Sequence, residues 1–149
     1  MRNSRKPLRP GHTLAELLLV LLVLGLATVV ALRQLQLHLD HLAAKGAISE
    51  AAGVIARARD EAVAQRTPVA VRVDSVAGTL RLEERGKGIM TVALGHAYGV
   101  TLESSRDSIA YDVRGLGFGA ANLTLVARRH TAAETLTVSR LGRVRVVGQ

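Results

Sequence analysis

Few residues of this chain have the types and spacing that catalysis or metal binding requires. His38, Asp40 and His41 lie close together in the sequence, but the two histidines are three residues apart and no third ligand is near. A catalytic zinc ion takes three protein ligands. Cysteine is absent, which excludes a thiol nucleophile, a disulfide and a cysteine-bound zinc. We therefore interpret the cluster as a solvated helix face and expect no metal ion.

The other polar groups lack the sequence context that chemistry needs. The run 115–119 (Gly-Leu-Gly-Phe-Gly) has neither the sixth-position glycine nor the following helix of a phosphate-binding loop. Glu83 and Glu84 follow a predicted strand, where a solvated pair is the simpler interpretation, and no serine lies in a nucleophile-elbow sequence. No catalytic triad or cofactor motif is visible, so we expect neither an enzyme nor a cofactor.

The most informative charged residue is Glu16, which lies inside a long apolar segment. Residues 14–32 number 19 and are apolar or small apart from Glu16 and Thr28. A helix of this length spans about 28 Å, close to the hydrocarbon thickness of a bilayer. A carboxylate at the centre of a membrane helix costs roughly 2.5–3.5 kcal/mol, less near an interface, and such a residue is a functional hypothesis by default.

The residues before this segment suggest a partner for Glu16. Four basic residues and no acidic one occur in the first ten positions, which predicts a cytoplasmic N-terminus. If the chain is cut after Gly11, the new α-amine on His12 lies four residues, about one helical turn, before Glu16. In a stack of such helices, Glu16 of one subunit could pair with the α-amine of a neighbour. The buried charge would then be neutralised on assembly.

The run 11–16 (Gly-His-Thr-Leu-Ala-Glu), between a basic leader and an apolar helix, resembles the class III signal of type IV pilins and type II secretion pseudopilins. The resemblance implies cleavage between Gly11 and His12 by prepilin peptidase and N-methylation of His12, which stands where the family usually has Phe. Two other interpretations compete. An uncleaved signal anchor leaves Glu16 unexplained, and a signal peptide cut after Ala31 is disfavoured by a charge in its apolar core.

Beyond the membrane segment the pattern stays helical from near Thr13 to about Gln65, where Thr67-Pro68 predicts the end. One stripe at three- and four-residue spacing consists of Ala47, Ile48, Ala51, Ile55, Ala58 and Ala62. We expect this stripe to face a sheet. The predicted organisation is a cleaved leader (1–11), a transmembrane part of the helix (12–32), its periplasmic half (33–65) and a β-rich domain (66–149).

From Pro68 onward the apolar period changes to two. Residues 69–74 and 79–83 alternate between apolar and polar, and the link 75–78 predicts a hairpin. Further short strands are expected near residues 99–103, 122–127, 135–139 and 143–147. The fold class is therefore α+β, with a long N-terminal helix packed on a small, mostly antiparallel β-sheet.

The domain carries a second pattern, which runs from the start of the hairpin to a Gly-Arg-Val-Arg ending. Its residues are Arg66, Pro68, Gly117, Val138, Ser139, Gly142, Arg143 and Arg145. The pattern is similar to the GspH/FimT family of type IV pilin-like minor pseudopilins and minor pilins. This resemblance implies a structural subunit at or near the tip of the periplasmic pseudopilus of a type II secretion system. It also implies other pseudopilins, an inner-membrane assembly platform and secreted cargo as partners, and a single-pass location in the bacterial inner membrane.

The alternative is a FimT-like minor pilin of a type IV pilus that binds DNA for uptake. Residues 128–149 hold five arginines (128, 129, 140, 143 and 145) and one acid. A strand at 143–147 would project Arg143 and Arg145 outward and turn Val144 and Val146 to the core. Gly-Arg-x-Arg resembles the DNA-contacting tail of FimT-like members, but arginines also protect a solvated edge strand. With two Tyr and one Phe, the chain has little with which to stack bases. The sequence leaves both functions open.

Overall fold

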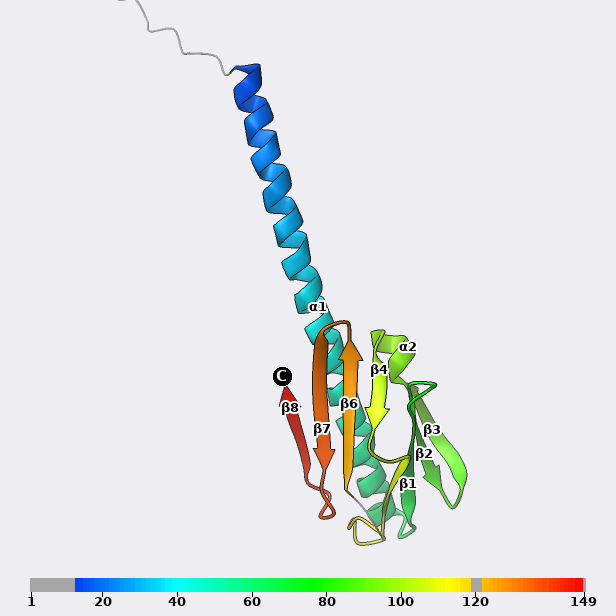
Figure 1. The fold of residues 1–149 in the computed structure, drawn as a ribbon. Helices are drawn as coiled ribbons and strands as arrows, with labels where there is room; N and C mark the ends of the chain where they lie inside the picture. The colour runs from blue at the N-terminus through cyan, green and yellow to red at the C-terminus, as the bar shows by residue number, and fades with distance from the viewer. Residues whose placement is uncertain (1–12, 119–121, 149) are drawn as a thin grey trace, which may run out of the picture. The chain divides into compact units, whose positions relative to one another are not determined.

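The computed structural model describes residues 13–118 and 122–148. The chain divides into two compact units, Met1–Gln36 and Leu37–Gln149. Within the described residues the order of elements is α1, β1–β3, α2 and β4–β8 (Figure 1). Helix α1 (Leu14–Ala64) belongs to both units, whereas every strand belongs to the second.

The extent of α1 confirms the long helix predicted from the sequence, and its C-terminal end has a local cause. Arg66 takes a left-handed conformation with φ 51°. The Thr67 N–H then donates to the Ala62 carbonyl oxygen at 3.3 Å, across the helix end. This bond closes a Schellman-type cap, in which a left-handed residue satisfies carbonyls that the helix leaves open. Pro68 follows directly and cannot continue a helix.

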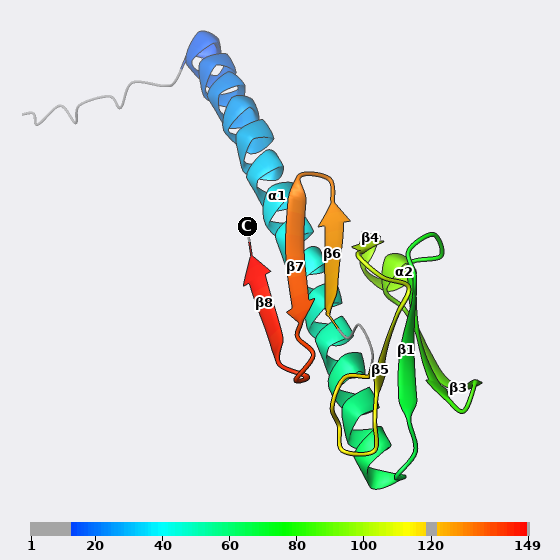
Figure 2. The same cartoon turned by 60° about the horizontal axis from the view of Figure 1, so that its bottom comes forward.

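The strands of the second unit form two antiparallel sheets (Figure 2). One has the order β3-β2-β1-β5, built from β1 (Val69–Asp74), β2 (Thr79–Glu84), β3 (Lys87–Ala93) and β5 (Ser108–Tyr111). The other has the order β4-β6-β7-β8, built from β4 (Thr101–Ser104), β6 (Leu123–Arg129), β7 (Ala132–Val138) and β8 (Val144–Gly148). The single turn of α2 (Leu94–Tyr98) lies between β3 and β4.

The α+β class is confirmed, with one correction: the single small sheet expected from the sequence is two four-stranded sheets. The predicted hairpin is present, with Val69 paired to Glu84 and Asp74 to Thr79. The four further strands appear as β4, β6, β7 and β8. Three elements were not predicted: β3, α2 and β5. Strand β3 is an edge strand with no fully buried side chain, so its sequence lacks an alternating apolar pattern.

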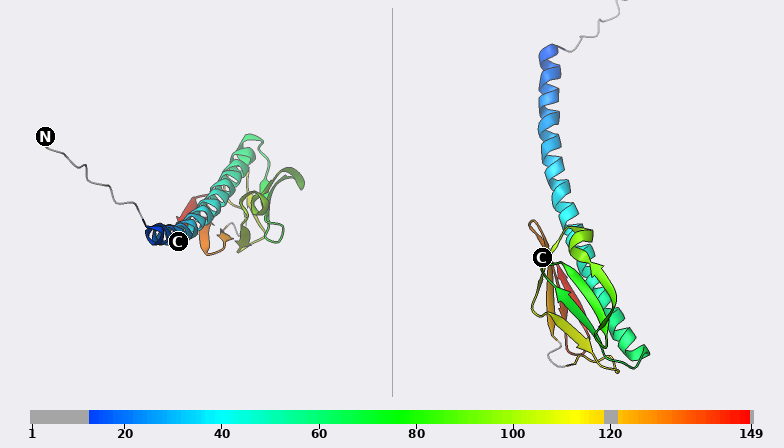
Figure 3. Two further views of the ribbon diagram at one scale, coloured as in Figure 1. Left: turned by 90° about the horizontal axis from the view of Figure 1, so that it is seen from above. Right: turned by 90° about the vertical axis from the view of Figure 1, so that its right-hand side faces the viewer.

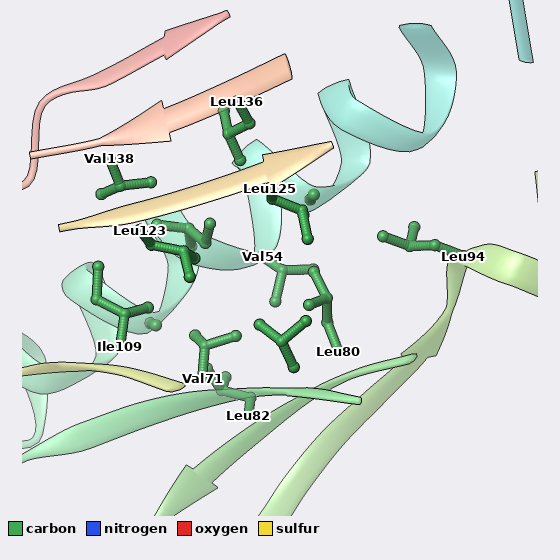
Figure 4. Close-up of a cluster of buried hydrophobic side chains, with 14 of the residues drawn as sticks. Val54, Val71, Leu80, Leu82, Leu94, Ile109, Leu123, Leu125, Leu136 and Val138 are labelled. Carbon is green, nitrogen blue, oxygen red and sulfur yellow. The ribbon is translucent and has the colours of Figure 1, made fainter. Parts of the chain in front are cut away.

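The core of the second unit forms where one face of α1 meets both sheets, which lie on the same side of this part of the helix (Figure 3). The six predicted stripe residues of α1 are all at most 1% exposed. Figure 4 shows side chains of Val54, Val71, Leu80, Leu123, Leu125 and Leu136 gathered in this core. The stripe consists mostly of alanine, because small side chains let strands approach the helix backbone closely.

A polar contact fixes α1 to the second sheet near the start of this unit. Asp40 is buried, and its Oδ1 lies 2.9 Å from Arg129 Nε while its Oδ2 lies 3.1 Å from His130 Nδ1. His130 begins the two-residue turn between β6 and β7 with φ 50°, a conformation that few residues other than glycine adopt. Arg129 also donates from Nη1 to the Tyr98 carbonyl oxygen at 2.7 Å, which joins α2 to the same contact.

Tyr98 connects back to α1 through its side chain. A hydrogen bond with Glu50 raises the pKa of the Tyr98 hydroxyl, because this bond favours the protonated phenol beside a carboxylate. Asp40, Glu50, Tyr98, Arg129 and His130 therefore link α1, α2 and the β6–β7 turn.

Enlarging a stripe residue should destabilise the second unit. We expect Ala51→Leu to lower the free energy of unfolding by about 1–3 kcal/mol, because the added atoms have no space between helix and sheets. Ala56→Leu, on the exposed face of the same helix, should change it by less than about 0.5 kcal/mol. Urea unfolding of the full chain in detergent measures both, and equal effects would contradict the packing described.

Removing the Asp40 carboxylate should also destabilise the unit. We expect Asp40→Ala to lower the free energy of unfolding by about 1–3 kcal/mol, because Arg129, whose side chain is 34% exposed, loses the charged partner that a buried carboxylate provides. The control is Glu103→Ala, which breaks the exposed pair with Arg128 and should have an effect of at most about 1 kcal/mol. Thermal unfolding followed by circular dichroism distinguishes the two. An Asp40 effect no larger than that of Glu103 would show that this contact does not anchor the helix.

Candidate assembly site and basic surface

Glu16 lies in the first turn of α1, directly after a helix cap. Thr13 precedes the helix, and its Oγ1 accepts a hydrogen bond from the Glu16 N–H at 3.2 Å. The Leu17 N–H donates to the Thr13 carbonyl oxygen at 3.2 Å. Thr-x-x-Glu is the sequence of a capping box, and a carboxylate in the first turn also interacts favourably with the helix dipole. Glu16 thus stabilises the start of the helix, in addition to any part it plays between subunits.

The predicted cleavage site, Gly11-His12, lies outside the described residues. Neither the cut nor a pairing of Glu16 with an α-amine can therefore be followed in the structure, and both stay predictions.

The first unit presents apolar side chains on every side of the helix. Each described residue of this unit is exposed, and its leucines and valines are each more than half exposed. One 18-residue window of α1 has a mean hydropathy of 2.7, and none of it is buried. A helix that is apolar all round needs an apolar environment. By length and composition this segment can cross a membrane, as the sequence predicted.

Two glycines, one in each of the loops that follow β5 and β7, have a packing role that the sequence did not reveal. Gly115 and Gly142 both have φ of 73° and lie in the β5–β6 and β7–β8 loops. A Cβ built on Gly115 would lie 3.1 Å from Arg59 Cγ, and one on Gly142 would lie 3.4 Å from Arg59 Cδ. The Arg59 side chain of α1 therefore crosses both glycines. Their positive φ angles and this close approach explain why glycine occurs at both positions.

Asp112 organises the β5–β6 loop. Its Oδ1 accepts hydrogen bonds from the backbone N–H groups of Arg114 and Leu116, both at 2.9 Å, and its Oδ2 accepts from Arg114 Nη2 at 2.9 Å. These bonds, the one from Leu116 first, hold the pKa of Asp112 below its usual value because they favour the ionised carboxylate. Beside this loop, burial raises the pKa of Tyr111, whose side chain is fully buried.

The basic C-terminal end agrees only in part with its prediction. Arg143 and Arg145 are exposed, and Val144 packs partly against the core as expected. Val146, expected to anchor the strand, is 47% exposed instead, because β8 is an edge strand and has a neighbouring strand on one side only. In the Ser139–Arg143 turn, the Arg143 N–H donates to Ser139 Oγ at 3.2 Å and fixes the start of β8.

The five arginines of this region do not form one cluster. Arg128 pairs with Ala133 on β7, whereas Arg145 pairs with Thr137, four residues further along that strand. This separation is about 13 Å. Arg128 and Arg129 are also held by Glu103 and Asp40, respectively. Arg140, Arg143 and Arg145 remain near one another, and within the described chain no carboxylate pairs with any of them.

No group of three His, Asp or Glu side chains that could hold a metal ion occurs in the described part of the chain. Asp40, which the sequence places between two histidines, binds Arg129 and His130 instead. This contact could not be predicted from the sequence, because its members lie far apart along the chain.

Comparison with known proteins identifies the family. The profile of a family described as Type II transport protein GspH matches residues 47–142. Among solved structures, the type IV minor pilin FimU of Pseudomonas aeruginosa has a TM-score of 0.59 and 17% identity, and the alignment covers 70% of this chain and 87% of that one. The minor pseudopilin EpsH from the type 2 secretion system of Vibrio cholerae has a TM-score of 0.55 and 14% identity, with 70% and 96% covered. A search of curated protein sequences found no match.

At such low identities the two structures bear on the fold alone, and both share it. The family profile covers well over half of the chain. This protein therefore belongs to the GspH family and is a type IV pilin-like minor subunit.

Proposed function

We propose that this chain is a minor pseudopilin of a type II protein secretion system, incorporated at or near the tip of the periplasmic pseudopilus. The observation that carries this proposal is the GspH match in a chain whose helix α1 begins with an uncovered apolar segment. Such a subunit acts by assembly, so its functional residues are those that place it in the membrane and in the fibre.

In this proposal the chain is made as a precursor in the bacterial inner membrane, with residues 1–11 cytoplasmic and the domain periplasmic. Prepilin peptidase cuts between Gly11 and His12, and the α-amine of His12 becomes methylated. The inner-membrane platform then extracts the subunit and adds it to other pseudopilins. The fibre pushes secreted cargo outward.

Glu16 is central to the assembly step. In the membrane its charge is unfavourable, by up to roughly 2.5–3.5 kcal/mol at the bilayer centre. In the fibre, the α-amine of a neighbouring subunit compensates that charge. Glu16 therefore favours transfer from the lipid into the fibre.

A second function within the same family is supported by a different observation. Arg143 and Arg145 are exposed and have no carboxylate partner in the described chain. Free guanidinium groups along an edge strand can bind phosphates, as a minor pilin for DNA uptake would require. We rank this function second because it concerns one strand, whereas the family match covers most of the domain.

Processing is the first test. The mature protein extracted from membranes should begin at His12, because the peptidase needs a small residue before the bond it cuts. Intact-mass spectrometry measures this directly, and an added methyl group should appear on the new N-terminus. Gly11→Leu should block the cut, while Pro10→Ala should leave it unchanged. A mature chain that starts at Leu32 or retains Met1 would rule out a pilin-type precursor.

The charge of Glu16 provides the second test. Glu16→Val should still insert in the membrane and be cleaved, but its cross-linking to neighbouring pseudopilins should fall, because the partner α-amine loses its carboxylate. Thr28→Val is the control: its hydroxyl donates only to the Leu24 carbonyl oxygen within the same helix. This variant should assemble normally. Unchanged cross-linking of the Glu16 variant would refute the pairing.

A salt titration separates the two functions. If the chain binds DNA, the affinity of the detergent-solubilised protein for duplex DNA should fall steeply with salt as counterions are released. Replacing Arg143 and Arg145 with Ala should then reduce the salt slope by about two units, one per phosphate contact. Replacing Arg81 and Arg85, on the other sheet, should not. If the wild-type chain does not bind DNA at low salt, the DNA-uptake function is excluded.

A further inference from the structure

Two loops of the second unit lie side by side at the end where α1 finishes, as Figures 1 and 2 both show. One connects β5 to β6 and the other connects β7 to β8. The Gly117 N–H of the first loop donates to the Arg140 carbonyl oxygen of the second at 2.9 Å. The Phe118 N–H donates to the Ala110 carbonyl oxygen at 2.8 Å. These bonds hold the described parts of both loops in place.

The joined loops expose large apolar side chains. Phe118, the only phenylalanine of the chain, is 73% exposed, and Leu141 is 72% exposed. Leu116, which also belongs to the first loop, is 37% exposed. Burial of such side chains against a partner is favourable. Single exposed apolar residues are common, but a group of them on loops held by backbone hydrogen bonds is typical of a protein interface.

The charges around these side chains are unbalanced. Arg140 and Arg143 lie in the second loop, are exposed, and have no carboxylate partner in the described chain. By contrast, Arg114 of the first loop pairs with Asp112. Aromatic side chains and arginines are the residues enriched at protein interfaces. We call Leu116, Phe118, Leu141, Arg140 and Arg143 together the loop-end surface.

We propose that the loop-end surface docks an acidic and apolar surface of another pilin-like subunit. The inference rests on the proposed function, and it adds which face of the domain contacts a neighbouring subunit. A protein partner fits better than DNA, because a phosphate backbone offers no apolar surface that could cover the two exposed leucines. A different subunit fits better than a second copy, because this chain has 20 Lys and Arg against 12 Asp and Glu, and a second basic chain would repel a basic surface.

Photo-cross-linking in cells that express the full chain together with the other pilin-like subunits tests the proposal. A photo-reactive residue replaces Phe118 or Leu141 in turn. The control position is Val76, which is fully exposed in the turn between β1 and β2 on the other sheet. Cross-links to a pilin-like subunit, identified by mass spectrometry, are expected from positions 118 and 141 and not from 76.

Charge reversal is the second arm. Replacing Arg140 and Arg143 with Glu should lower the cross-linking yield from position 118 about tenfold, because both charges then repel the acidic partner. Replacing Arg81 and Arg85 with Glu, which changes the net charge equally, should leave the yield unchanged. A product with nucleic acid, lipid or a second copy, an equal yield from position 76, or no product from 118 and 141 would overturn the proposal.

A reporter in the apolar helix distinguishes this failure from failure of the proposed function. A photo-reactive residue at Leu19 should cross-link to other subunits whenever the chain enters a fibre. If Leu19 cross-links and positions 118 and 141 do not, docking through the loop-end surface is refuted, whereas the proposed function as a fibre subunit is retained. If Leu19 does not cross-link to any pilin-like subunit, both are wrong.

Discussion

The packing of two sheets against one alanine-rich face of α1 is the contact on which the rest of the domain depends. Neither sheet buries its apolar face without the helix, because the core contains side chains from α1 and both sheets together. A β-rich segment of this size is near the lower limit for independent stability. The apolar first unit and the scaffold of the second unit are thus parts of one continuous helix.

The sequence predicts those elements whose apolar period is set by burial. Residues of the α1 stripe are nearly inaccessible to solvent, and β1 and β2 alternate as half-buried strands do, so both were predicted with nearly correct bounds. Strand β3 has no fully buried side chain, and β5 has only four residues after the charged pair Arg106-Asp107. Because neither strand has an apolar period, neither was predicted from the sequence. The prediction therefore had one sheet where the structure has two.

The candidate site follows the same division. Glu16 was predictable because a carboxylate in an apolar helix needs a local explanation, whatever the rest of the fold. The contact of Asp40 with Arg129 and His130 was not, because it depends on which turn of the second sheet meets the helix. The roles of Gly115 and Gly142 likewise become clear only when Arg59 is seen to cross both. Sequence reveals a residue that conflicts with its neighbours in the chain, but it does not reveal one whose partner is distant.

The arginines of the second unit include some that pair with a carboxylate of the domain and others that have no carboxylate partner in the described chain. Arg72, Arg114, Arg128 and Arg129 each have a carboxylate partner within the domain, so they belong to its internal electrostatics. Arg140, Arg143 and Arg145 lie together at one end of the second sheet without one. Positive charge alone suits either a phosphate backbone or an acidic protein, and arginine therefore does not decide between the two functions of this family. The neighbouring side chains of Phe118 and Leu141 gain free energy only where a partner excludes water, so this end of the domain suits a protein surface better than a phosphate backbone.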